Sequence, residues 1–347
     1  MRAAVFDAFG ARIAVRDVAA PEPHDDAAIV AVAACGICRS DWHAWMGHDP
    51  GVRPPHVPGH EFAGTVAAVG GAVRRFRGGE RVTAPFCCGC GTCPDCRRGD
   101  THVCDRQTQP GFTHFGAFAE FVEVRHADTN LVPLPDTVGF AAAAALGCRF
   151  ATAHRAVVGQ GRAAAGDWVA VHGCGGVGLS AVAIAVALGA RVVAVDPSPV
   201  RRRTALDLGA SEALDAGAGD LPARIRAVTG RGARVSIDAF GAAQTLVDSL
   251  ASLANRGRHV QVGLLFGAEA RAPLPMDLVI AKELEIAGGH GMPVGDYAGL
   301  LELVAAGRLD PARLVSDTVG LAEGAALLTR FDTFPNRGMT LIDLARG

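Results

Sequence analysis

The sequence predicts an α/β protein in which a doubly wound parallel sheet is inserted into a second, β-rich domain. Residues 1–149 are rich in Gly, Pro and short alternating segments, which are typical of short strands joined by turns. Residues 150–288 alternate short β-branched runs with Ala- and Leu-rich stretches, the pattern of a parallel sheet covered by helices. The tail, 289–347, returns to Gly- and Pro-punctuated sequence, so we assign it to the first domain.

Each element is predicted from its own periodicity. In the first domain, residues 61–69 and 119–124 alternate in the manner of half-buried strands. In the second domain, the predicted strands are 169–171, 191–195, 235–238 and 259–262. The predicted helices between them are 178–189, 200–208 and 242–255. One more helix is predicted in the tail, at 296–306.

Composition and charge exclude several classes of protein. The 347 residues suffice for about two domains, 50% of them are hydrophobic and the net charge is -2, so neither a disordered chain nor a basic nucleic-acid binder is expected. The single tyrosine, Tyr297, is followed four residues later by Leu301, which excludes reductases built on a Tyr-x-x-x-Lys pair. The single lysine, Lys282, lacks a preceding glycine-rich run, which excludes a Walker-type phosphate loop.

The stretch 169–195 is almost uncharged, and its hydropathy suggests a membrane span. Glycines at 173–178 and at Gly189 interrupt it, so we predict a buried strand–turn–helix–strand unit and no membrane association. The first residues show no apolar core behind a basic flank. We therefore expect no secretory signal and a reducing, cytoplasmic location.

A glycine-rich segment follows the first predicted strand of the second domain. Gly173, Gly175 and Gly178 occupy the first, third and sixth positions of a turn that opens a predicted helix, where a dinucleotide pyrophosphate can meet free N–H groups. Asp196 closes the next strand, and its carboxylate favours NAD over NADP because it accepts from ribose hydroxyls and repels a 2′-phosphate. The arginines at 201–203 keep NADP open as an alternative, and a glycine-rich turn that only packs is the other.

Cysteine spacing predicts a metal site. Six of the ten cysteines lie between Cys87 and Cys104. Four of these can close a tetrahedral shell on one zinc ion, and a full thiolate shell leaves no position for substrate, so the site is predicted to be structural. These four are Cys90, Cys93, Cys96 and Cys104. Disulfides and a nucleic-acid-reading zinc module are the alternatives, which the expected compartment and the net charge disfavour.

A second metal site would have to be assembled from distant residues. The candidates are Cys38, His60 and Cys148. Two thiolates and an imidazole leave the fourth zinc position open, which is the catalytic pattern. Judged singly, Cys148 fits a core thiol better and His60 fits a loop histidine. Together, and beside a dinucleotide-binding pattern, they predict a catalytic zinc.

These motifs, with Gly-Ile-Cys-Arg-Ser-Asp-Trp-His at 36–43 and Gly-His-Glu-Phe-Ala-Gly at 59–64, cover essentially the whole chain. The sequence resembles the zinc-dependent alcohol dehydrogenases of the medium-chain dehydrogenase/reductase family. The resemblance implies a dinucleotide-binding Rossmann domain at 150–288, inserted into a GroES-like, zinc-binding catalytic domain formed by 1–149 and 289–347. It also implies NAD, two zinc ions per chain, and hydride transfer between NAD and a primary or secondary alcohol to give an aldehyde or ketone.

The resemblance assigns roles around the catalytic zinc, whose ligands would be Cys38, His60 and Cys148. Glu61 would lie behind the metal and Asp41 would orient His60. Ser40 would hydrogen-bond the substrate oxygen, and His43 would pass the proton out through the cofactor ribose. A histidine suits that task because its ordinary pKa is about 6.5.

Cofactor and pocket residues follow in the same way. Arg39 would contact the pyrophosphate, Thr152 would lie near the nicotinamide and Phe86 would line the substrate pocket. The full candidate set for cofactor binding is Arg39, Thr152, Gly173, Gly175, Gly176, Val177, Gly178, Asp196, Arg201 and Val262. Arg337 is a further candidate for the pyrophosphate.

Some residues depart from the family pattern or have no assigned role. Arg149 follows Cys148, where many relatives carry a small residue. No role is predicted for four thiols, those of Cys35, Cys87, Cys88 and Cys174.

Three other functions remain open. A polyol or amino-alcohol dehydrogenase would share the zinc ligands and differ in its pocket. Zinc-free quinone or enoyl reductases usually lack the cysteine segment found here. A non-catalytic dinucleotide-binding protein would need a broken ligand set. We expect a small-molecule partner, and a homotetramer or homodimer.

Overall fold

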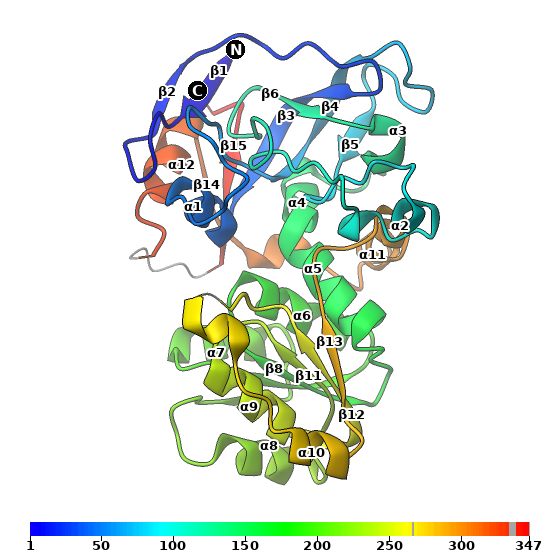
Figure 1. Ribbon diagram of the computed structural model, residues 1–347, viewed down its shortest axis with the longest axis vertical. Coiled ribbons are helices and arrows are strands. Elements are labelled where there is room, and N and C mark those ends of the chain that lie inside the picture. The colour runs from blue at the N-terminus through cyan, green and yellow to red at the C-terminus, as the bar shows by residue number, and fades with distance from the viewer. Residues whose placement is uncertain (266, 333–337, 347) are drawn as a thin grey trace. The chain divides into compact units, whose positions relative to one another are not determined.

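The computed structural model describes residues 1–265, 267–332 and 338–346. The chain forms two compact units (Figure 1). The first contains Met1–Ala151 and the chain from Gly291 onward, and the second is Thr152–His290. The second unit is thus inserted into the first, in the order that the sequence suggested.

A seven-stranded sheet forms the centre of the first unit, in the order β14-β15-β3-β4-β5-β7, with β6 also paired to β3. A separate pair, β1 and β2, accompanies it. The strands are β1 (Arg2–Val5), β2 (Ala14–Asp17), β3 (Ala28–Ile37), β4 (Glu61–Val69), β5 (Arg81–Thr83), β6 (Phe121–Val124), β7 (Val132–Pro133), β14 (Val315–Val319) and β15 (Met339–Asp343). Their apolar faces bury a core that includes Val30, Phe62 and Phe118.

Short helices connect these strands, and some of them carry residues of the candidate site. They are α1 (Arg39–Trp45), α2 (Pro94–Arg97), α3 (Ala127–Asn130), α4 (Phe140–Ala145), α11 (Tyr297–Ala305) and α12 (Leu321–Leu328), with the π-helix η2 (Leu146–Phe150) and the 3₁₀ turns η1 (Thr101–Val103), η5 (Val294–Asp296) and η6 (Pro311–Leu314). The longest strand, β3, runs antiparallel to β4, β6 and β15. A Cβ at Gly64 of β4 would collide with the Ala31 carbonyl oxygen, so the close β3–β4 approach requires glycine.

The second unit is a six-stranded sheet in the order β10-β9-β8-β11-β12-β13, parallel throughout. Its strands are β8 (Trp168–His172), β9 (Arg191–Val195), β10 (Glu212–Leu214), β11 (Ala233–Asp238), β12 (Leu253–Gln261) and β13 (Glu285–Gly288). Its helical segments are α5 (Ala151–His154), η3 (Arg155–Gln160), α6 (Gly176–Ala187), α7 (Pro199–Asp207), α8 (Leu221–Thr229), α9 (Ala243–Ala251), η4 (Gly267–Arg271) and α10 (Met276–Ala281). The predicted doubly wound sheet is therefore confirmed, and its strand order reverses between β8 and β11, where such sheets bind ligands.

Two predicted elements have wrong bounds, and several were missed. The helix predicted at 242–255 stops at Ala251, because Leu253 already pairs with Ala233 of β11, and β12 therefore begins six residues before the strand predicted at 259–262. The short helix α8 and the tail elements β14, α12 and β15 were not predicted. Among the residues that the structure describes, no helix has the length and apolar character needed to cross a membrane.

Candidate functional site

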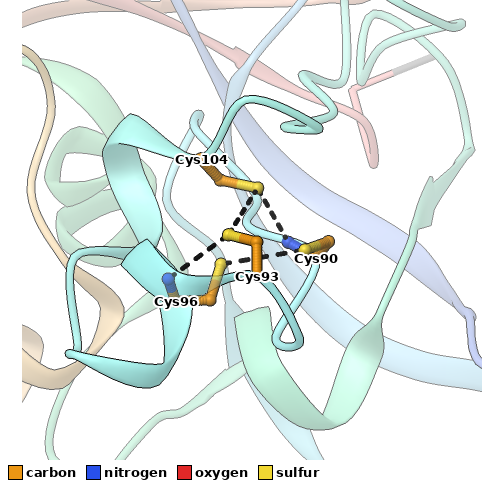
Figure 2. Close-up of side chains that lie close together, drawn as sticks. All are labelled: Cys90, Cys93, Cys96 and Cys104. Atoms are coloured by element: carbon orange, nitrogen blue, oxygen red, sulfur yellow. Dashed lines mark hydrogen bonds between the residues drawn. The ribbon is translucent and has the colours of Figure 1, made fainter.

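Four cysteines from one surface loop of the first unit converge on a point. Cys90, Cys93, Cys96 and Cys104 place their sulfur atoms within 4.8 Å of one another (Figure 2). We call this group the lobe cluster. All ten cysteines lie in the described part of the chain, and none of them forms a disulfide there. The four thiols that the spacing grouped together are therefore close together in the structure.

N–H groups surround the sulfur atoms of the lobe cluster. The Cys90 amide donates to Cys104 Sγ at 3.4 Å, and the Cys96 amide donates to Cys93 Sγ at 3.4 Å (Figure 2). Arg106 donates twice, from its amide to Cys104 Sγ at 3.3 Å and from Nη2 to Cys90 Sγ at 3.2 Å. Such donors stabilise thiolates, the form in which cysteine binds metals.

Hydrogen bonds to the Cys90 sulfur lower the pKa of this thiol. Burial raises the pKa of the Cys90 thiol, but hydrogen bonds from the Thr92 hydroxyl and from the Thr92 and Cys93 backbone outweigh it and lower the pKa to about 5. Arg106 Nη2 also bonds Thr92 Oγ1 at 2.8 Å and thereby secures that side chain. Arg106 was not identified from the sequence, although it stands only two residues after Cys104.

A second group is assembled from three separate segments of the first unit. Cys38, His60, Glu61 and Cys148 are all buried, and one ligand atom from each lies within 4.8 Å of the others. We call this group the assembled cluster. Cys38 follows β3, His60 directly precedes β4, Glu61 begins β4, and Cys148 lies in η2. Antiparallel pairing of Gly36 with Glu61 brings the first two segments together.

Asp41 orients His60 within the assembled cluster. His60 Nδ1 lies 2.8 Å from Asp41 Oδ1, and the amides of Cys38 and Gly59 donate to the same carboxylate at 2.9 and 3.0 Å. The His60 ring therefore presents Nε2 to the cluster, 3.5 Å from Ser40 Oγ. Burial lowers the pKa of His60, but the adjacent Asp41 carboxylate raises it well above its usual value.

Arg149 binds Glu61 of this cluster. Arg149 Nε lies 3.0 Å from both Glu61 carboxylate oxygens, its amide bonds Oε1 at 3.1 Å, and Nη2 contacts Oε2 and the Ile37 carbonyl. Burial raises the pKa of Glu61, and Arg149 opposes this shift in part. The two side chains are 5% and 0% exposed, so they form a buried ion pair. A Cβ at Gly36 would collide with this carboxylate.

The pairing of Arg149 with Glu61 was not predicted. The two residues stand 88 positions apart, and the position of Arg149 beside Cys148 was the only signal in the sequence. A basic residue next to a metal-ligand candidate does not reveal which acidic residue it faces.

The other predicted residues of the first unit are distributed around the assembled cluster. Ser40 Oγ lies 3.1 Å from Cys38 Sγ. The Phe86 ring stands edge-on to His60, with centroids 6.0 Å apart. Arg39 begins α1 and stacks over the Phe331 ring at 5.6 Å. Arg337 lies outside the described residues.

Two aromatic residues near the cluster were missed. Phe112 packs edge-on to His60 at 5.2 Å between ring centroids. The Tyr297 hydroxyl donates to the Leu146 and Gly147 carbonyls at 3.2 and 3.3 Å, and so supports the π-helix that carries Cys148. The sequence identified Tyr297 only as the single tyrosine, with no signal for this contact.

His43 has a partner that the sequence did not suggest. Its Nδ1 atom lies 2.9 Å from Nδ1 of His48. Burial, then His48 and Arg39, lower the pKa of His43 below its usual value, so its ring is neutral at pH 7.

The glycine-rich segment of the second unit has the geometry of a phosphate-binding turn. Gly173 follows β8 with φ +90°, which favours glycine. A Cβ at Gly175 would meet no atom within 4 Å, whereas one at Gly178 would collide with the Gly173 carbonyl. The three glycines thus supply a tight turn, an open approach and close packing at the N-terminus of α6, whose first residues are Gly176 and Val177.

Asp196 lies at the end of β9, beside this turn. Its two carboxylate oxygens each accept one backbone N–H at 2.8 Å, from Cys174 and from Ser198. Arg201 Nη1 lies 3.8 Å from Oδ2. A carboxylate has about four lone-pair sites, so acceptor capacity remains for a further donor.

Two further cofactor candidates lie elsewhere in the second unit. Val262 follows β12 and its amide bonds the Asp238 carbonyl at 2.9 Å. Thr152 is buried in α5.

The two units together define a class of protein, the metal-dependent dehydrogenases built on a doubly wound sheet. Two family models match the chain: the alcohol dehydrogenase GroES-like domain over residues 24–136 and the zinc-binding dehydrogenase over residues 176–306.

Individual relatives cover nearly all of the chain. An NAD-dependent alcohol dehydrogenase of Sulfurisphaera tokodaii is 31% identical over 99% of both chains. A sorbitol dehydrogenase of Bacillus subtilis is 30% identical over 93% of this chain and 92% of its own. The solved structure of an alcohol dehydrogenase from Thermus sp. ATN1 superposes with a TM-score of 0.91, at 35% identity, over 99% of both chains. The chain belongs to the zinc-type alcohol dehydrogenases of the medium-chain dehydrogenase/reductase family and is an oxidoreductase.

Proposed function

We propose that this protein transfers a hydride between a primary or secondary alcohol and NAD, giving an aldehyde or ketone, with the help of a zinc ion at the assembled cluster. The observation that carries the proposal is the donor set: the two thiols and the imidazole of Cys38, Cys148 and His60 lie within 4.8 Å of one another. This set fits zinc, because it fills three positions of a tetrahedral shell and leaves one for substrate.

Each residue in or near the assembled cluster has a separate role in alcohol oxidation. A zinc ion held by Cys38, His60 and Cys148 would supply a Lewis acid that lowers the pKa of an alcohol hydroxyl. Ser40 Oγ would accept the alcohol proton while it releases its own hydroxyl proton toward His43, a role supported by its position 3.1 Å from Cys38 Sγ. His43 takes that proton onward, and its lowered pKa supports this role because a neutral ring can accept a proton at pH 7. Arg149 holds Glu61 behind the ligands through their buried ion pair.

We infer a second, structural zinc ion at the lobe cluster. Four thiolates complete a tetrahedral shell and exclude substrate. The N–H donors from Cys90, Cys96 and Arg106 support the thiolate form that such a shell needs.

The dinucleotide is proposed to bind at the glycine-rich turn, with the pyrophosphate at Gly175, Gly176 and Val177. NAD held by these residues would supply the hydride acceptor. Asp196 supports NAD over NADP because its buried carboxylate at the end of β9 repels a 2′-phosphate. Arg201 is held 3.8 Å from that carboxylate, which makes it a weaker partner for phosphate.

A polyol dehydrogenase is the second candidate function. It is favoured by the similarity to the sorbitol dehydrogenase of Bacillus subtilis and would use the same ligand set. A non-catalytic dinucleotide-binding protein is disfavoured, because every side chain expected in the assembled cluster is present there.

Metal analysis combined with a substrate screen tests the proposal. The purified protein is expected to hold about two zinc ions per chain. Absorbance at 340 nm should report NADH formation with at least one primary or secondary alcohol, and more slowly with NADP in place of NAD. A zinc-loaded protein that oxidises no member of a panel of primary, secondary, aromatic and polyol alcohols would reject it. A strong preference for polyols would favour the second candidate.

The remaining expectations stay predictions. A homotetramer or homodimer would be recognised by light scattering after size-exclusion chromatography. The cytoplasmic location would be recognised by fractionation of the source cells.

A further inference from the structure

The segment after α1 turns back so that His48 reaches His43. Gly47 adopts φ +80°, a conformation that favours glycine, and its amide donates to the Ala44 carbonyl at 3.1 Å. The His48 amide then donates to the His43 carbonyl at 2.9 Å. These bonds close the helix end and place two histidines, five positions apart, next to each other.

The two imidazole rings are joined directly. Their Nδ1 atoms are 2.9 Å apart and their centroids 5.3 Å apart. The indole of Trp42 stands edge-on to both rings, at 5.0 Å from His43 and 5.7 Å from His48. His43 is half-buried and His48 is exposed, so the pair leads from the interior of the first unit toward water.

A hydrogen bond between two Nδ1 atoms requires that one ring donates and the other accepts. When His43 gains a proton at Nε2, its Nδ1–H can donate to Nδ1 of His48. The proton can then cross to His48, and His48 can release a proton from its own Nε2. Each ring takes one proton and releases one, so both end neutral, and each then carries its proton on the opposite ring nitrogen from the one where it began.

The charges around the pair favour this direction. Burial disfavours a lasting positive charge on His43 most, followed by His48 from the following segment and then Arg39 on the same helix. The thiol of Cys38 acts in the opposite sense and is the weakest of these influences. A proton on His43 is therefore held less firmly than on an isolated histidine, which promotes its transfer outward.

We propose that His48 is the outlet of the proton route, carrying the proton released by alcohol oxidation from His43 to solvent. The inference rests on the proposed function, in which His43 receives that proton. His48 acts through His43 and is a positioning and relay residue.

A variant that keeps the contact but cannot relay tests this inference. In His48→Gln the side-chain amide oxygen can still accept a hydrogen bond from His43 Nδ1–H, but the amide cannot take up and release protons near pH 7. Proton release is followed with a pH indicator in weakly buffered stopped-flow experiments on the zinc-loaded enzyme with NAD and alcohol. We expect release about tenfold slower near pH 7, no difference near pH 10, and recovery on addition of imidazole.

His126→Gln is the matched control. His126 is a half-exposed histidine of the same unit, whose Nδ1 is likewise engaged, 2.6 Å from Asp26. Its variant should release protons at the unaltered rate. If His48→Gln also releases protons at the unaltered rate near pH 7, or is not restored by imidazole, the relay is overturned.

Two readouts separate this inference from the proposed function. An unaltered enzyme that oxidises no alcohol contradicts the proposed function, and with it this relay. NMR titration of the ring nitrogens addresses the pair without turnover: in His48→Gln the pKa of His43 should rise toward its ordinary value, because one of the groups that lowers it is gone. An unchanged His43 titration would show that the pair is not electrostatically coupled, and would overturn the relay.

Discussion

The lobe cluster and the assembled cluster both bring metal-binding side chains together, but they do so from opposite kinds of sequence. The lobe cluster draws four cysteines from positions 90–104, and backbone amides and Arg106 supply its hydrogen bonds. The assembled cluster draws on positions 38–148, and side chains supply most of its hydrogen bonds. The difference teaches that a local site depends on turns, whereas an assembled site depends on the packing of a whole sheet.

The two clusters also differ in how they manage charge. The assembled cluster contains a carboxylate, Glu61, together with a buried cation, Arg149, and Asp41 bonded to His60. A buried ion is tolerated only when it is paired and hydrogen-bonded. The lobe cluster has partly exposed Cys93 at its edge and a cation, Arg106, that is itself exposed. Loss of a charged partner should therefore cost far more in the assembled cluster.

The largest expected effect is on activity, from Cys38→Ala. Removal of one ligand from the assembled cluster should lower alcohol oxidation by about 10³-fold or more, because the Lewis acid is lost. Zinc content should fall by about one ion per chain, as measured by mass spectrometry. Cys35→Ala is the matched control, since Cys35 is a buried thiol three residues earlier and outside both clusters. Equal losses of activity and zinc in Cys38→Ala and Cys35→Ala would contradict the assignment of Cys38 as a ligand of the assembled cluster.

The next effect is on stability, from Arg149→Ala. This change leaves the Glu61 carboxylate buried without its cation, and should lower the free energy of unfolding by about 3–5 kcal/mol. Urea denaturation followed by circular dichroism measures it. Adding Glu61→Gln to the same chain should restore much of the loss, because a neutral amide replaces the unpaired charge. A double variant no more stable than the single one would show that the ion pair is not the cause.

The smallest effect is expected at the lobe cluster, from Arg106→Ala. Loss of the guanidinium bond to Cys90 Sγ should speed zinc release to a chelator by about three- to tenfold, equivalent to about 1 kcal/mol. The amide bond from residue 106 to Cys104 survives the substitution. Arg98→Ala is the control on the same loop, because the Arg98 side chain forms an ion pair with Asp95 and is mostly exposed. Faster release from Arg98→Ala as well would assign the effect to general loop stability.

Local features were predictable from the sequence. Cysteine spacing identified the lobe cluster, because four thiols within one loop leave the backbone few ways to keep them apart. The glycine-rich turn was identified because a strand, three spaced glycines and a helix follow one another within one stretch of chain. The helix predicted at 242–255 failed at its end because only pairing with β11 reveals that Leu253 begins a strand.

Contacts between distant segments were not predictable. Arg149 meets Glu61 across 88 positions, and Tyr297 meets Leu146 across 151. Neither pair leaves a spacing or a periodicity in the sequence. His48 stands only five positions from His43, yet their contact depends on the conformation of Gly47.

The sequence by itself determined the different residue patterns of the two domains, the doubly wound sheet and the lobe cluster, because each depends on residues that are neighbours along the chain. The candidate ligands Cys38, His60 and Cys148 are distant along the chain, and the resemblance to a known family identified them. Only the tertiary structure decided that Cys148 joins Cys38 and His60, that Glu61 is paired with Arg149, and that His43 has a second histidine beside it. The physical reason is that burial and hydrogen bonding act between atoms close in space, and sheet pairing and helix ends determine which distant residues meet.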